Sequence, residues 1–538
     1  MKGEAQRVFD LVVRGGTVYG AGDAPSPADV AVVGDRIAAV GRLDGAEAIT
    51  EIDAAGKAVA PGFINILSHS YFTILHDPRS LGELTQGVTT QVFGEGSTMG
   101  PLTPAMKEEL ERRHADLSLR VSWSRLSEYL AHVEGRGCSQ NIASFVGTGT
   151  LRPYAVGYDD RPATKQEIDT MRGLVAEEMA DGALGIASAL IYPPESYIST
   201  EELVAVCEVA ASYGGIYISH MRDEGAGLLT ALDELLRISR EAKLPAEIFH
   251  LKASGRRNWQ LMDEALERVE SARAGGAPIT ADVYPYTASS TGLASVIPPR
   301  YHEGGPAALY DRLADPETRR SIRQDLLTVG RWGDTDRAED VLILRLEREE
   351  NRRYQGMTLS AIAEARGTDP IEATLDLIRD DRSRVGAAFF SMSEDNLRTQ
   401  LRRLWVGIGS DGSSMAPEGV FLRSPTHPRA YGTFARVLGR YVREERVLDL
   451  SDAIDRMTRL PATTLGLEGR GRLAEGCFAD IVVFVPETVA DRATFDDPHR
   501  LSVGVSDVVV NGEVAVRAGE PTGRLAGRAL YGPGRRRH

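Results

Sequence analysis

The middle of the chain alternates short, nearly continuous apolar runs with amphipathic helix patterns. Two of these helix patterns begin with capping boxes, Thr164-x-x-Glu167 and Ser199-x-x-Glu202, in which side chains satisfy the first free backbone amides. Apolar strands that alternate with helices are typical of parallel strands covered on both faces. The pattern therefore predicts an α/β fold, a (β/α)8 barrel of the TIM type. We expect its strands to end near residues 67, 93, 146, 191, 219, 250, 283 and 409.

The two ends of the chain share a different pattern, in which short β-type runs are separated by glycine-rich turns. Examples are Leu11-Val12-Val13 near the start and Ile481-Val482-Val483-Phe484 near the end. Further on, Asn511-Gly512 lies between two apolar runs and is a strong signal for a type I′ turn. We expect residues 1–60 and 461–538 to form one small β-sandwich.

The barrel is then inserted into this sandwich and occupies residues 61–460. Its alternating rhythm is broken once, at about 293–345, where proline, glycine and charged residues are frequent. This composition predicts an insertion that follows the seventh strand of the barrel.

Charge limits the partners of the protein. The 538 residues include 62 Lys and Arg against 77 Asp and Glu, so the formal net charge is −15. Nonspecific binding to nucleic acid or to an anionic membrane needs clustered cations. We therefore expect a small-molecule substrate, no nucleic acid and no membrane partner, and leave the oligomeric state open. The first ten residues lack the apolar core of a signal peptide, which predicts a cytoplasmic protein.

Two consecutive predicted strands each end in a histidine, His220 and His250. Strand ends meet on the C-terminal face of a barrel, where functional groups gather. Adjacent strands lie about 5 Å apart, so both imidazoles can reach one divalent ion at the ~2.0 to 2.1 Å typical of zinc. Taken alone, each histidine is more often a structural hydrogen-bonding group, and that interpretation stays open.

Three more polar residues follow strands at a matching depth: His69 after the first, Glu95 after the second and Asp411 after the eighth. Asp411 lies in the turn Ser410-Asp411-Gly412, where a carboxylate either caps a helix or serves as the base for metal-activated water. Glu95 is either a further site carboxylate or a surface loop acid.

Several motifs together resemble the metal-dependent amidohydrolase superfamily and, within it, the N-acyl-D-amino-acid deacylases (D-aminoacylases). The resemblance covers nearly the whole chain. The motifs are Asp10-Leu11-Val12-Val13-Arg14-Gly15-Gly16, Pro61-Gly62-Phe63-Ile64, His220-Met221-Arg222-Asp223-Glu224-Gly225, Asp282-Val283-Tyr284-Pro285-Tyr286-Thr287, Ser410-Asp411-Gly412, His427-Pro428-Arg429-x-Tyr431-Gly432-Thr433-Phe434 and Gly471-x-Leu473-x-x-Gly476-x-x-Ala479-Asp480.

The resemblance implies roles for individual residues. It carries over His220 and His250 as metal ligands and Asp411 as the carboxylate that activates water. Tyr192, Lys252 and Tyr284 match positions that line the substrate pocket in the family. A lysine beside phenols suits the carboxylate of an N-acyl amino acid. Alternatively, the two tyrosines pack under loops and the lysine is solvated.

The chain also departs from the family pattern. The pattern Asp-x-His-x-His is here Asn65-Ile66-Leu67-Ser68-His69, and leucine cannot bind a metal. We therefore expect one metal ion rather than two. Where these enzymes often carry a cysteine ligand, this chain has Glu95, a harder ligand that with two histidines suits zinc, or else manganese or cobalt.

The sequence thus predicts a hydrolase that cleaves the amide bond of N-acyl-D-amino acids. Glu95, His220 and His250 hold the metal, Asp411 moves the proton, and His69 is either a weaker ligand or a hydrogen-bond donor to the oxyanion. One alternative is a cyclic amidase or peptidase of the same superfamily, although the fourth strand lacks the lysine that those enzymes usually carry. A second alternative, favoured by Leu67, is a non-catalytic barrel that has lost part of its metal site.

Overall fold

The computed structural model describes residues 8–22, 24–329 and 335–535. Residues 1–7, on which much of the argument against a targeting segment rests, lie outside the described residues. Among the residues described, no helix combines the length and the apolar character needed to cross a bilayer. The cytoplasmic location stays a prediction.

The described residues of the central region form a closed barrel of parallel strands. An isolated parallel bridge between Ser68 and Gly412 joins the last strand to the first. The third strand is interrupted at Phe145, so it consists of two short segments. The predicted (β/α)8 barrel is confirmed. Its strands are β6 (Phe63–Asn65), β7 (Val88–Phe93), β8 (Asn141–Ser144) with β9 (Val146–Gly147), β10 (Gly185–Ala189), β11 (Ile216–His220), β12 (Ala246–Ile248), β13 (Ile279–Val283) and β17 (Val406–Ile408).

Amphipathic helices cover the outside of the barrel. The hydroxyls of Thr164 and Ser199 accept hydrogen bonds from the backbone amides of Glu167 and Glu202, as both predicted capping boxes require. The helices that follow barrel strands include α3 (Pro104–Arg113), α4 (Leu126–Arg136), α5 (Thr148–Ala155), α6 (Lys165–Asp181), α7 (Thr200–Ser212), α8 (Leu228–Ala242), α9 (Leu261–Ala274), α14 (Glu394–Leu401), α15 (Arg429–Arg436), α16 (Leu450–Met457) and α17 (Arg459–Thr464). Two short helices, α1 (Thr73–His76) and α2 (Leu81–Leu84), lie between β6 and β7.

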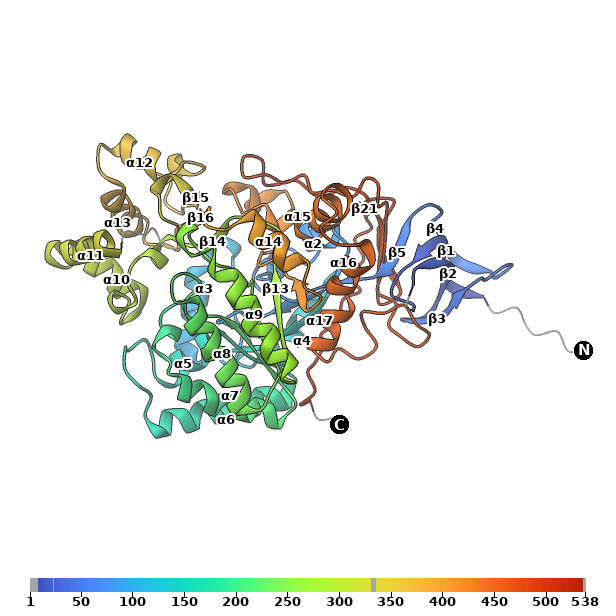
Figure 1. Ribbon diagram of the computed structural model, residues 1–538, viewed down its shortest axis with the longest axis horizontal. Coiled ribbons are helices and arrows are strands. Elements are labelled where there is room, and N and C mark those ends of the chain that lie inside the picture. Colours follow the sequence, from blue (N-terminus) through green and yellow to red (C-terminus); the bar gives the residue numbers. More distant parts are fainter. Residues whose placement is uncertain (1–7, 23, 330–334, 536–538) are drawn as a thin grey trace, which may run out of the picture.

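The two chain ends form one sheet of nine described strands, on the right in Figure 1, with a core that includes Leu11, Val32 and Ile481. Asn511 and Gly512 both have positive φ angles, 47° and 85°, as the predicted type I′ turn requires. The β-sandwich built from both ends is confirmed, whereas its limits at residues 60 and 461 stay a prediction. The strands are β1 (Phe9–Val18), β2 (Ser26–Val33), β3 (Arg36–Gly41), β4 (Ala48–Asp53), β5 (Ala58–Pro61), β18 (Ile481–Phe484), β19 (Val505–Val510), β20 (Glu513–Arg517) and β21 (Glu520–Pro521).

The insertion after β13 is longer than the predicted 293–345. Its apolar core runs from Leu293 to Phe389 and lies on the opposite side of the barrel from the end sheet (Figure 1). The helix patterns beyond residue 345 resemble barrel helices in sequence, but they pack into this separate core. The elements are β14 (Ser289–Gly292), α10 (Gly305–Ala314), α11 (Pro316–Val329), β15 (Val341–Arg345), α12 (Leu359–Arg366), α13 (Pro370–Asp381) and β16 (Gly386–Phe389).

Candidate metal centre

Three predicted ligands converge at the C-terminal end of the barrel. Glu95 follows β7, His220 ends β11 and His250 follows β12. The Oε1 atom of Glu95 lies 2.9 Å from Nδ1 of His220 and 2.8 Å from Nε2 of His250. All three side chains are at most 8% exposed. Nitrogen atoms of two imidazoles therefore meet one carboxylate oxygen at a single buried position.

The other oxygen of Glu95 faces a second pair of side chains. Its Oε2 atom lies 3.0 Å from Nε2 of His69, and the same nitrogen lies 2.9 Å from Oδ1 of Asp411. Oδ2 of Asp411 is 2.7 Å from the Arg429 guanidinium. Glu95 thus joins a ligand half, made with His220 and His250, to a base half made by His69 and Asp411.

The donor set of the ligand half fits a divalent metal. The ligand atoms of Glu95, His220 and His250 all lie within 4.8 Å of one another, and nitrogen with carboxylate oxygen is a donor set that zinc accepts. Burial alone would raise the pKa of Glu95, but hydrogen bonds from His220, His250 and His69 hold it well below the usual value. The group is therefore a carboxylate, the form that binds metal.

Backbone strain marks both halves of the site. His250 and Asp411 have φ angles of 33° and 49°, in the left-handed region that residues with a side chain rarely adopt. Hydrogen bonds hold both conformations: the His250 amide donates to Oδ1 of Asp282 and the Asp411 amide donates to the carbonyl of Leu67. Strain of this kind persists where the surroundings over-determine it, which is common at functional sites.

Glu224 is a site residue that the sequence reasoning did not assign. Its Oε1 atom lies 3.1 Å from Nδ1 of His250 and 2.7 Å from Nζ of Lys252, while Oε2 forms a longer ion pair of 3.5 Å with His220. One buried carboxylate therefore orients both imidazoles from behind, as outer-shell carboxylates do at metal sites. The sequence offered one indication of this role, because Glu224 belongs to the motif that begins at His220.

The three predicted substrate residues surround this centre. The ring of Tyr192 lies 5.2 Å from that of His220, and the ring of Tyr284 lies 6.2 Å from that of His250. Nζ of Lys252 is 5.9 Å from the Tyr284 ring and is bound to Glu224. Arg429, which the sequence reasoning also did not assign, lies 4.7 Å from the same ring.

A family model described as the amidohydrolase family matches residues 50–516. The chain belongs to this family. It is 35% identical to the D-aminoacylase of Alcaligenes xylosoxydans xylosoxydans, over 97% of each chain.

Two solved structures are similar to this amidohydrolase over nearly its whole length. A D-aminoacylase described as having a binuclear metal centre, with one-metal activation and second-metal attenuation, has a TM-score of 0.81 at 35% identity, covering 97% of this chain and 100% of that one. The N-acyl-D-glutamate deacylase of Bordetella bronchiseptica, with zinc and a phosphonate mimic of the tetrahedral intermediate, has a TM-score of 0.82 at 30% identity, covering 98% and 100%. The predicted membership of the D-aminoacylase family is confirmed.

Leu67, where the sequence predicted the loss of a metal ligand, lies inside the barrel of the amidohydrolase. The Leu67 side chain is 1% exposed and packs in an apolar cluster with Val92 and Phe249 inside the barrel. It offers no donor to a metal. In the segment 65–69, the side chain that reaches the site is His69.

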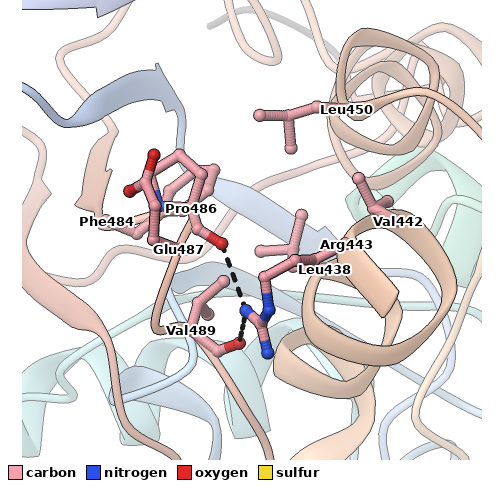
Figure 2. Close-up of a pocket in the computed structure, with 8 residues that line it drawn as sticks. All are labelled: Leu438, Val442, Arg443, Leu450, Phe484, Pro486, Glu487 and Val489. Carbon is pink, nitrogen blue, oxygen red and sulfur yellow. Dashed lines mark hydrogen bonds between the residues drawn. The ribbon is translucent and has the colours of Figure 1, made fainter. Parts of the chain in front are cut away.

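A separate pocket of about 200 Å³ lies between the π-helix Val437–Glu444 and the segment after β18 (Figure 2). Its lining is mainly aliphatic, and the guanidinium of Arg443 donates to the carbonyl oxygens of Pro486 and Val489. No residue of the metal centre lines this pocket.

Proposed function

We propose that this amidohydrolase cleaves the amide bond of N-acyl-D-amino acids and releases a carboxylate and a D-amino acid. The observation that carries the proposal is the convergence of Glu95, His220 and His250 on one point, next to Asp411. This arrangement occurs in a chain that is 35% identical to a D-aminoacylase.

Glu95, His220 and His250 would hold one divalent ion, zinc or else manganese or cobalt. When bound, such an ion polarises a carbonyl group and makes water more acidic. A second full site is not expected, because Leu67 takes the place of a ligand. Glu224 fixes the orientation of both histidines from their far side.

Asp411 is the base. Burial would raise the pKa of Asp411, but the charges of Arg429 and His250 lower it below its ordinary value, so the group is a carboxylate at neutral pH. Arg429 contacts Oδ2, and Oδ1, which has a second lone pair beside its contact with Nε2 of His69, is the atom that takes a proton from the attacking water. The same atom then delivers this proton to the leaving nitrogen.

His69 donates a hydrogen bond to the oxyanion. Burial lowers the pKa of His69, yet hydrogen bonds with Asp411 and Glu95 outweigh it and raise the pKa to about 9. An imidazolium donates hydrogen bonds, which is the role proposed for His69. Its side chain is 25% exposed, so a substrate can reach it.

Tyr192, Lys252 and Tyr284 line the substrate pocket. Lys252 and Arg429 both face the Tyr284 ring, which places two cations on one wall of the site. Lys252 is paired with Glu224 and Arg429 with Asp411, so the carboxylate of an N-acyl amino acid would share these cations with the two partners.

Direct assay tests the proposal. The purified protein is loaded with zinc and offered matched N-acetyl-D- and N-acetyl-L-amino acids, dihydrouracil and hydantoin. We expect release of acetate from D-substrates, with about one zinc per chain by elemental analysis. Preferred opening of the cyclic amides would support the alternative amidase, and absence of bound metal would support a non-catalytic barrel.

A further inference from the structure

A buried polar cluster lies beneath the base half of the site. It consists of Asn65 at the end of β6, Glu83 on α2 and Ser410 after β17, each with an exposed fraction of 0%. Nδ2 of Asn65 lies 2.7 Å from Oε1 of Glu83 and 2.7 Å from Oγ of Ser410. Oγ of Ser410 lies 2.9 Å from the same Glu83 oxygen, and the Ser410 amide donates to Oδ1 of Asn65 at 2.8 Å.

The cluster occupies the seam where the barrel closes. Among the described residues, β17 and β6 are joined by the isolated bridge of Ser68 and Gly412 rather than by a full ladder. The Gly412 amide also donates to Oγ of Ser410, and the His69 amide donates to the carbonyl of Gly412. Side-chain hydrogen bonds therefore replace the missing ladder at the point from which His69 and Asp411 extend.

We propose that Glu83 is a positioning residue that, through Asn65 and Ser410, fixes Asp411 against His69. Ser410 directly precedes Asp411, so the hydrogen bonds of its amide and hydroxyl constrain the left-handed backbone of Asp411. The effect on turnover rests on the function proposed above. The effect on the backbone does not.

The hydrogen-bond donors and acceptors of the three side chains complement one another. Burial raises the pKa of Glu83 to about 8, against hydrogen bonds from Ser410 and Asn65 that lower it, so the carboxyl is largely protonated at neutral pH. Oε2 of Glu83 is buried without a hydrogen-bond partner, which disfavours the charged form. An amide at position 65 donates both to Oε1 of Glu83 and to Oγ of Ser410, whereas a carboxylate at this position has no N–H to donate to either atom.

The test is a double-substitution cycle at neutral pH with the zinc-loaded protein. Glu83→Leu should lower kcat at least tenfold while KM and zinc content change less than threefold, and Glu83→Gln should retain at least a third of kcat. Asn65→Asp should also lower kcat about tenfold. Asn65→Asp combined with Glu83→Gln should recover at least fivefold relative to Asn65→Asp, because the introduced glutamine amide can donate to the new carboxylate.

Hydrogen–deuterium exchange of residues 406–413 gives a readout that needs no substrate. We expect exchange at the amides of Ser410 and Gly412 to accelerate at least tenfold in Glu83→Leu and to stay near the unsubstituted rate in Glu83→Gln. Equal exchange in all variants, or additive effects in the cycle, would overturn the proposal. If the unsubstituted protein hydrolyses none of the amides while exchange changes as expected, the proposed function fails and the positioning of the Asp411 backbone stands.

Discussion

The ligand half and the base half of the site are built in different ways. Glu95, His220 and His250 extend from strands within continuous ladders, and Glu224 contacts both histidines. His69 and Asp411 extend from the seam of the barrel, and a cation, Arg429, contacts the base. The first arrangement fixes donor atoms, as metal binding requires, whereas the second tunes a proton acceptor. Substitutions in the ligand half should therefore reduce metal binding, whereas substitutions in the base half should reduce turnover and leave the metal bound.

Removal of a ligand should have the largest effect. His220→Ala or Glu95→Ala leaves two donors, so we expect zinc to be lost and hydrolysis to fall below detection. Elemental analysis after dialysis, together with the acetate-release assay, checks this result. His132→Ala, on α4 beside Trp123, is the matched control and should keep both metal and activity. Full zinc content in His220→Ala would remove that residue from the ligand set.

Substitution of the base should separate activity from metal binding. Asp411→Asn keeps the size of the side chain and removes its ability to take a proton. We expect kcat to fall about 10²- to 10⁴-fold, the range of general base catalysis, while zinc content stays unchanged. Parallel kinetics and elemental analysis measure the two effects. Substantial turnover in this variant would contradict the role of Asp411.

The contrast between the halves also explains what the sequence could predict. Apolar strands with His220 and His250 at their ends could be recognised, because a barrel brings all strand ends to one face. Glu224 lies in the loop between β11 and α8, and Arg429 is the first residue of α15, so neither is at the end of a barrel strand. The Asp411–Arg429 contact depends on how the chain turns after the eighth strand. The predicted end of the insertion, at about residue 345, was wrong. The helices α12 and α13 have the same amphipathic pattern as barrel helices, and only their packing distinguishes the two groups.

Glu224 should have an intermediate effect confined to the ligand half. Glu224→Ala removes the carboxylate behind His220 and His250 and leaves the buried Lys252 without the carboxylate with which it pairs. We expect zinc affinity to fall about 10- to 100-fold, as for other outer-shell partners. Competition with a chelator measures this affinity. The neighbouring Asp223→Asn, whose carboxylate accepts from the Gly225 amide, is the control, and an equal loss there would indicate a loop effect instead.

Arg429 should have the smallest effect, and that effect should appear in the base half as a shift on the pH axis. Arg429 lowers the pKa of Asp411, and Asp411 must be deprotonated to act, so activity rises as pH rises through that pKa. Arg429→Met removes the charge, which raises the pKa and moves the acid limb of kcat/KM to higher pH by about 1 unit or more. Arg429→Lys keeps a cation and should move it less, and neither variant should lose zinc. A limb that stays in place in Arg429→Met would show that the Asp411–Arg429 ion pair does not set the protonation of the base.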